Sequence, residues 1–164
     1  PMTPKEYTEA YKNFMREKEV YYISEHRGSY DNKNELRDII KDNNDLIIFA
    51  ISITRFAAYK AKFELERKGF KVSIANILWI KPFKIKKKWI NALKTSKYGG
   101  IILDDDYPQG IISDMAYELM KITNKKIFTL GLKNKSAGFS KKSDNLPPNE
   151  KDIEKLALKI IKKK

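Results

Sequence analysis

Three consecutive aspartates form the densest group of side chains in this sequence that could do chemistry. Asp104, Asp105 and Asp106 directly follow the apolar segment 101–103. Carboxylates at the end of a strand could hold Mg²⁺ through oxygen ligands. Successive side chains of an extended segment point to opposite sides, however, so at most two of the three would converge on one ion. We therefore favour a turn that leads into a helix, whose first residues are often acidic.

One histidine and one run of lysines are the other candidates. His26 follows an expected strand over residues 20–25 and could carry a proton near neutral pH. A lone histidine with no placed partner more often makes a structural hydrogen bond. The lysine run is interpreted as a solvated helix face that could contact an acidic partner; it comprises Lys81, Lys84, Lys86, Lys87 and Lys88.

Several common catalytic and binding motifs are absent from the sequence. It has no G-x-G-x-x-G dinucleotide fingerprint, no P-loop and no G-x-S-x-G nucleophile elbow. A single histidine makes the usual zinc sites implausible. These absences leave no conventional catalytic centre within the chain.

Length and composition narrow the class of protein. The chain has 164 residues, which suits one domain, and 41% of them are hydrophobic. It has no cysteine, which excludes disulfides and favours a cytoplasmic location, and no apolar run approaches the roughly 20 residues of a membrane span. Because it starts at Pro1, we interpret it as a fragment or a processed subunit of something longer.

The net charge of +13 admits a second interpretation. A free-standing basic module could bind an acidic partner or nucleic acid. No nucleic-acid-binding signature accompanies the charge, and the excess of lysine over arginine is typical of AT-rich genomes. We therefore expect nucleic acid not to be a partner, and keep the basic module as the alternative function.

The N-terminal third and the rest of the chain have different patterns. Residues 3–18 predict an amphipathic helix that Thr3 caps, with Glu6 completing a capping box. A strand over 20–25 and a polar stretch over 31–45, with a short helix around 36–40, should follow.

From residue 46 onward, strand and helix patterns alternate. Strands are expected at 46–51, 70–78, 101–103 and 127–130, and helices at 54–68, 86–95, 112–119 and from 149 onward. This alternation predicts a mainly parallel sheet with helices on both faces. Functional surfaces of such sheets lie beyond the carboxyl ends of the strands, here at 52–54, 79–82, 104–109 and 130–138.

Four segments together resemble the C-terminal domain of transketolase-like thiamine-diphosphate enzymes. Residues 20–30 are similar to the family strand P-V-V-x-x-E-H-K-x-x-Y, and residues 77–83 match the ending of L-R-T-L-K-P-L. Residues 104–113 follow the frame of the acidic turn E-D-H-Y-x-x-G-G-x-G, and residues 144–153 resemble L-P-x-x-x-x-I. The likeness is strongest to the beta subunit of the decarboxylating component of 2-oxoacid dehydrogenases of the pyruvate or branched-chain type.

The resemblance implies a fold and a division of the chain. It implies a three-layer α/β/α domain around a five-stranded, mostly parallel mixed sheet with one antiparallel strand. Residues 1–30 would be the last helix and strand of a preceding pyrimidine-binding domain, 31–45 a linker, and 46–164 the transketolase C-terminal-like domain.

The resemblance also implies where chemistry would be lacking. The family histidine of the acidic turn is Asp106 here, two of its glycines are Ile111 and Ser113, and the G-D-G…N motif for metal and diphosphate is absent. We expect no catalytic, cofactor-binding or metal-binding residue in this chain, and assign thiamine diphosphate and Mg²⁺ to the parent enzyme.

What remains is a role in subunit assembly and at the active-site entrance. The implied partners are a second copy, an alpha subunit or a pyrimidine-binding domain, with no membrane association. The candidate interface or entrance residues are His26, Asp105, Asp106, Tyr107, Gln109, Ser136 and Phe139.

Overall fold

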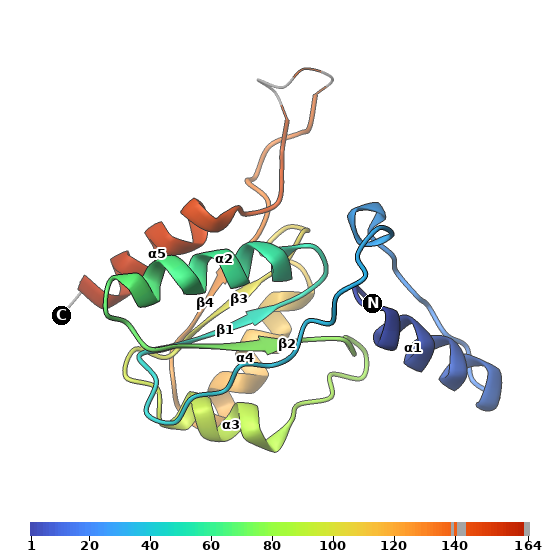
Figure 1. Ribbon diagram of the computed structural model, residues 1–164, viewed down its shortest axis with the longest axis horizontal. Helices are drawn as coiled ribbons and strands as arrows, with labels where there is room; N and C mark the ends of the chain where they lie inside the picture. Colours follow the sequence, from blue (N-terminus) through green and yellow to red (C-terminus); the bar gives the residue numbers. More distant parts are fainter. Residues whose placement is uncertain (139, 141–143, 163–164) are drawn as a thin grey trace.

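The computed structural model describes residues 1–138, 140 and 144–162. Its core is a parallel four-stranded sheet between two layers of helices, with one further helix set apart beyond the carboxyl ends of the strands (Figure 1). Within the described residues, no helix has both the length and the apolar character needed to cross a bilayer. The expected α/β/α architecture is therefore confirmed.

Every strand pairing in the sheet is parallel. The spatial order is β2-β1-β3-β4, and Ile48 of the central β1 lies opposite Ile74 on one side and Ile101 on the other. All residues of the first three strands are buried, as their continuous apolar runs predict. The strands are β1 (Leu46–Ala50), β2 (Val72–Asn76), β3 (Gly100–Leu103) and β4 (Ile127–Leu130).

Alternate residues of each strand serve two separate hydrophobic cores. Ile47 and Phe49 of β1 belong to one core, and Phe49 meets the ring of Trp89 edge-on at 6.1 Å between centroids. Leu46 and Ile48 point to the opposite core. The first core is covered by α3 (Lys87–Lys94) and α4 (Ile111–Thr123), and the second by α2 (Thr54–Arg67) and α5 (Glu150–Lys162) (Figure 1).

The predicted fifth, antiparallel strand was wrong for the described residues. In its place, the described part of the chain has an isolated antiparallel bridge between Ile39 and Ile74. Its two backbone hydrogen bonds measure 2.8 and 2.7 Å. The short helix expected around 36–40 was also wrong, because this segment is extended. Asp38 accepts a hydrogen bond from the backbone N of Asn76 at 2.8 Å, so tertiary contacts override the local helical pattern.

Helix α1 (Pro4–Arg16) is confirmed, with Thr3 Oγ1 accepting a hydrogen bond from Glu6 N at 3.4 Å. The strand expected at residues 20–25 was wrong. The chain is stretched out over this segment (Figure 1) but forms no strand in the structure. Val20 is 100% exposed and Tyr22 93% exposed. A period-two pattern makes a strand only when a neighbouring strand supplies the hydrogen bonds.

The α1 helix is fastened to the carboxyl edge of the sheet by its carboxylates. Both oxygens of Glu6 accept hydrogen bonds from Arg55 Nη1, at 2.7 and 2.6 Å. Glu9 Oε1 accepts a hydrogen bond from Trp79 Nε1 at 3.1 Å. Residues from the first turns of α1 therefore reach α2 and the segment that follows β2.

Candidate functional site

The strand order reverses between β1 and β3, and their carboxyl ends define the candidate site. The chain moves from β1 outward to β2, then crosses back to β3 on the other side of β1. In open α/β sheets, the crevice at such a reversal is the usual place for ligands and partners. Ser52 follows β1 at this point, and the aspartates 104–106 follow β3.

Ser52 joins the ends of the two strands. Its Oγ donates a hydrogen bond of 2.8 Å to Asp105 Oδ2. Its backbone φ of 52° lies in the left-handed region, which residues other than glycine adopt rarely. Strained conformations of this kind persist where the surroundings over-determine them, and they cluster at functional sites.

Asp104 is the buried member of the acidic turn. It is only 4% exposed, and its Oδ1 accepts a hydrogen bond of 2.8 Å from the backbone N of Asp105. Burial first, and then the hydrogen bond and negative charge of the Asp105 carboxylate, raise the pKa of Asp104 to about 7. A proton is therefore held at the switch point of the sheet near neutral pH.

The exposed half of the turn is tied to the segment that follows β4. Leu132 N donates a hydrogen bond of 2.9 Å to the carbonyl of Asp106, and Tyr107 Oη donates one of 3.0 Å to the carbonyl of Lys135. Gly131 makes this approach possible, because a Cβ there would lie 2.2 Å from the Asp106 carbonyl oxygen. The acidic turn and the segment after β4 thus form one continuous surface, which we call the acidic rim.

The structure brings together most of the predicted entrance residues. Asp105, Asp106, Tyr107 and Gln109 share the turn after β3. Ser136 is exposed and follows Lys135, whose carbonyl Tyr107 binds. The remaining candidate of this loop, Phe139, lies outside the described residues.

His26 lies on the N-terminal segment rather than in the turn. Its Nδ1 accepts a hydrogen bond of 3.0 Å from Gly28 N and caps the short 3₁₀ helix η1 (Arg27–Ser29). This helix approaches the end of β1, since a Cβ on Gly28 would lie 2.8 Å from Ile53 Cδ1. The structural hydrogen bond considered for His26 is therefore present.

The turn does not have the geometry of a metal centre. Across the part of the chain that the structure describes, no group of three histidine, aspartate or glutamate side chains is placed to hold a metal ion. Asp104 Oδ1 and Asp105 Oδ2 instead accept hydrogen bonds from the protein itself. The chemistry available here is proton binding and hydrogen bonding.

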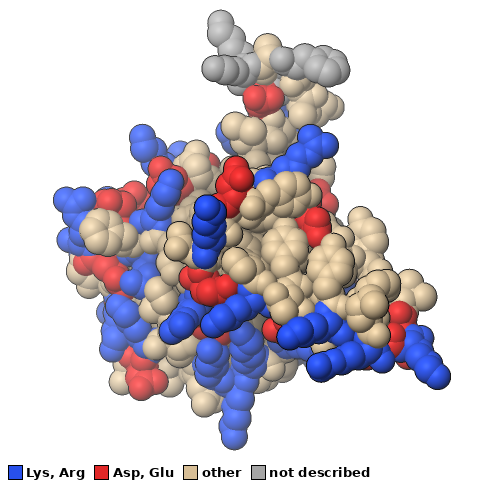
Figure 2. Space-filling view, turned by 45° about the vertical axis from the view of Figure 1, so that its right-hand side comes forward, with Lys and Arg blue, Asp and Glu red and all other residues tan. Residues whose placement is uncertain are grey.

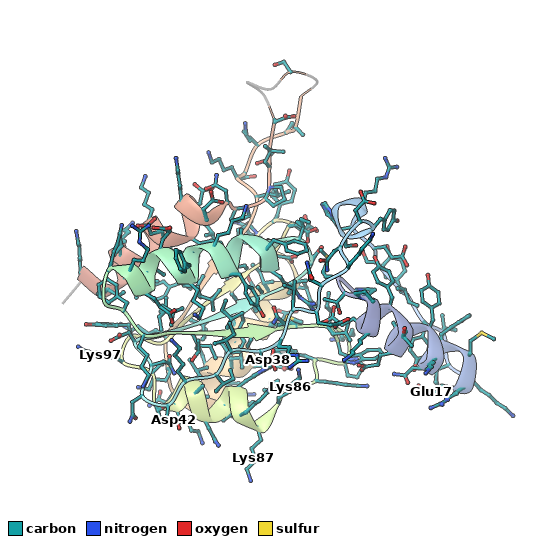
Figure 3. The ribbon with its side chains drawn as sticks, in the orientation of Figure 1. Glu17, Asp38, Asp42, Lys86, Lys87 and Lys97 are labelled. Atoms are coloured by element: carbon teal, nitrogen blue, oxygen red, sulfur yellow. The ribbon has the colours of Figure 1, made fainter. Side chains whose placement is uncertain are left out.

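The lysine run is partly neutralised by an aspartate in the predicted linker. Asp38 Oδ2 lies 3.0 Å from Lys86 Nζ and 2.8 Å from Lys88 Nζ, while Lys87 points away from the body of the protein (Figure 3). Burial tends to raise the pKa of Asp38, but hydrogen bonds from Lys88, Asn76 N, Lys86 and Trp89 outweigh it and lower that pKa. Figure 2 shows basic and acidic side chains interspersed on one face of the protein.

Two buried polar residues beside this edge were missed at the level of sequence. Arg55 is 1% exposed and pairs with Glu6. A signal existed, because Arg55 precedes Ala58 by three residues and so lies on the buried face of α2. Asn76, the last residue of β2, gave no such signal. Its role depends on contacts with residues 36–38 and Tyr59.

Comparisons with known proteins agree with this architecture. The model of the family "Transketolase, C-terminal domain" matches residues 37–135. A solved structure described as "Split gene transketolase, inactive beta4 tetramer" is similar, with a TM-score of 0.61 at 17% identity. The alignment covers 80% of this chain and 43% of that one, so the likeness concerns less than half of the solved chain. No curated protein matches this sequence.

Proposed function

This chain belongs to the transketolase C-terminal domain family, and we propose that it serves assembly and the active-site entrance of a thiamine-diphosphate-dependent enzyme. The parent would be a 2-oxoacid dehydrogenase, with this chain in its beta subunit, or a transketolase. Thiamine diphosphate and Mg²⁺ would be bound by the pyrimidine-binding and diphosphate-binding parts of that enzyme. In this proposal the present chain contributes surfaces and no reacting group.

The observation that carries the proposal is the unpaired extended segment at residues 20–25. Val20 and Tyr22, which we call the apolar strip, are 100% and 93% exposed. Between them, the Tyr21 ring packs against Phe14 and Trp79 at 6.1 and 6.3 Å between centroids. A segment that is held to the protein by one ring and exposes the neighbouring apolar side chains suits pairing with another sheet.

The partner that fits this segment is the rest of a pyrimidine-binding domain. In this proposal residues 1–30 complete that domain, residues 31–45 lead out of it, and the unit from residue 46 docks beside it. The similar solved structure is described as a "beta4 tetramer", and this supports the proposal that the present chain also assembles with further copies of itself.

The acidic rim would face the entrance in such an assembly. Asp105, Asp106, Tyr107 and Gln109 occupy the carboxyl edge, where α1 and the 3₁₀ helix of His26 also lie (Figure 1). Ser136, which follows Lys135, extends the same rim in this proposal. A rim with a proton-binding carboxyl at its base could screen substrates by charge without taking part in the reaction.

Self-assembly and partner binding test the proposal directly. The complete chain is examined by size-exclusion chromatography with light scattering, alone and with the pyrimidine-binding subunit of the same enzyme. The double variant Val20→Asp/Tyr22→Asp should lose the association, and Leu146→Asp, which alters another exposed apolar side chain, should keep it. The proposal would be contradicted if the chain stays monomeric and also does not bind that subunit.

Turnover assays test the absence of a catalytic centre. The isolated chain is incubated with thiamine diphosphate, Mg²⁺ and pyruvate or a branched-chain 2-oxoacid. We expect no decarboxylation, because the chain has neither the metal–diphosphate motif nor the cofactor-activating glutamate of its family. Turnover by this chain alone would overturn the proposal.

A further inference from the structure

A pocket of about 580 Å³ lies beside the carboxyl end of β2, away from the acidic rim. Its volume falls within the range of ordinary ligand sites. Three segments that are distant in the sequence form its walls: the start of α1, residues 36–38, and residues 76–89. We call it the basic pocket, and its lining includes Arg37, Asp38, Asn76, Trp79, Lys84 and Lys88.

The basic pocket holds cations that the protein does not neutralise. Asp38 is matched by two lysines, Lys86 and Lys88, which leaves one positive charge in excess. Lys84 makes no ion pair with any described residue, and its Nζ lies 4.1 Å from the centroid of the Trp79 ring. An ammonium group held over an aromatic face keeps donors free for an anion.

The acidic groups in the opposite wall are already engaged. Glu6 is occupied by Arg55, and Glu9 accepts the indole N–H of Trp79 at 3.1 Å. The Glu9 carboxylate keeps its negative charge and can accept further hydrogen bonds, but it makes no ion pair with Lys84 in the part of the chain that the structure describes. One wall thus supplies donors with positive charge, and the other supplies acceptors.

Asn76 adds an unsatisfied acceptor to the same pocket. The residue is 4% exposed, and its Oδ1 has no hydrogen-bond partner among the described residues. Its Nδ2 donates to the carbonyl of Leu36 at 3.3 Å and to Tyr59 Oη at 3.2 Å. Because a carbonyl can only accept, this contact fixes which side of the amide is Oδ1. Buried polar atoms without partners are rare in proteins and require an explanation.

From these features, we propose that the basic pocket binds a small hydroxylated oxyanion, in which a phosphate or carboxylate group and a hydroxyl belong to one molecule. The oxyanion would lie against Lys84 and the excess charge of Lys86 and Lys88. The hydroxyl would donate its hydrogen bond to Asn76 Oδ1, which an oxyanion alone could not satisfy. This site is separate from the assembly role and stands or falls independently of it.

The chain carries its own reporter for the test. Its only two tryptophans, Trp79 and Trp89, both line the basic pocket, so intrinsic fluorescence responds to occupancy. The complete chain is titrated with glycerol 3-phosphate, glycerate, inorganic phosphate and glycerol at constant ionic strength. We expect a saturable change with one or both of the first two, which separates phosphate from carboxylate as the source of the anion. Glycerol should give no change, and inorganic phosphate should bind more weakly.

Substitutions at two lysines, one inside and one outside the pocket, test whether the fluorescence change comes from binding in the basic pocket. Lys84→Gln should weaken binding by about tenfold, the loss expected for one charge-assisted hydrogen bond. Lys87→Gln removes the same charge from a side chain that points away, and should leave the affinity unchanged (Figure 3). Asn76→Asp, checked for folding by circular dichroism, places a negative charge beside the anion and should abolish binding.

Clear results would overturn the inference. These are the absence of any saturable change with either hydroxylated anion, equal weakening by Lys84→Gln and Lys87→Gln, or inorganic phosphate binding as tightly as both. If Asn76→Asp does not fold, the Lys84 and Lys87 pair still decides the outcome. The indole N–H resonances of the two tryptophans give a second readout by nuclear magnetic resonance.

Discussion

Ser52 Oγ and Asp105 Oδ2 are joined by a hydrogen bond of 2.8 Å that closes the crevice between the carboxyl ends of β1 and β3. The place where such sheets usually receive a ligand is thus bridged by the protein's own side chains. The bridge depends on a left-handed backbone at Ser52 and on a buried, proton-binding neighbour, Asp104. Both features can be tested on the purified chain.

The Ser52–Asp105 bridge should contribute measurably to stability. Ser52→Ala keeps the left-handed backbone but removes the donor, so the free energy of unfolding should fall by about 1 kcal/mol. A double-mutant cycle with Asp105→Ala, followed by urea denaturation, should give a coupling energy of about 0.5–1.5 kcal/mol. Additive effects of the two substitutions would mean that the bridge contributes nothing.

Stability should depend on pH through Asp104. The pKa of Asp104 is raised from 3.8 to about 7 in the folded protein, so the folded chain binds this proton more tightly than the unfolded chain. The stabilisation is complete below about pH 4 and is lost as pH rises to about 7. The side chain at position 104 of the Asp104→Asn variant is neutral at every pH. The urea midpoint of this variant minus that of the wild type should therefore increase between about pH 5 and about pH 8. A difference in midpoint that stays constant across this range would contradict the raised pKa of Asp104.

The Arg55–Glu6 ion pair should contribute far more to the stability of the folded chain than an exposed ion pair does. Arg55 is 1% exposed, so Glu6→Gln leaves a buried guanidinium without its counter-charge and should destabilise the chain by about 3 kcal/mol. Glu64→Gln breaks the exposed pair with Arg67 and should change stability by less than about 1 kcal/mol. Thermal unfolding of the two variants makes the comparison. Similar effects would show that α1 is held by other contacts.

The rim between the acidic turn and the segment after β4 should not tolerate a side chain at Gly131. In Gly131→Ala the new Cβ would lie 2.2 Å from the Asp106 carbonyl oxygen, so one of the two segments must move. We expect a loss of about 1–3 kcal/mol and faster amide exchange at Leu132. At Gly110 the nearest atom to an added Cβ is 3.2 Å away, so Gly110→Ala should be milder. Equal stability of both variants would contradict the tight approach.

The elements from β1 onward were predictable because each has a strong local pattern. The expected strands at 46–51, 101–103 and 127–130 agree with the structure to within a residue at their ends. The expected strand at 70–78 was too long, since β2 covers Val72–Asn76. The sequence continues to be apolar after Asn76, because Ile77 still packs into the core although it no longer belongs to the sheet.

The N-terminal errors have a common physical cause. The segment 20–25 has the pattern of a strand, and the residues around 36–40 have the pattern of a helix. The first finds no partner strand among the described residues, and the second is held extended against β2. In both cases the outcome depends on hydrogen bonds with residues distant in the sequence, about which local propensity gives no information.

Glu6 illustrates the same division within one residue. The capping-box pattern identified it as part of a helix start, and its Oε2 does accept a hydrogen bond from Met2 N at 2.9 Å. Its pairing with the buried Arg55 could not be read from that pattern, because the two residues are 49 positions apart. Local spacing predicted the cap, and packing added a second role.

The sequence alone determined the sheet type, the two-sided burial of its strands and the acidic turn at the end of β3, because each follows from short-range pattern or composition. It also carried the family resemblance. Only the tertiary structure decided which strand ends meet, that Asp104 is buried and holds its proton near pH 7, and that Asn76, Lys84 and both tryptophans line one pocket. Those properties depend on distances and desolvation between segments far apart in the chain, which no local pattern encodes.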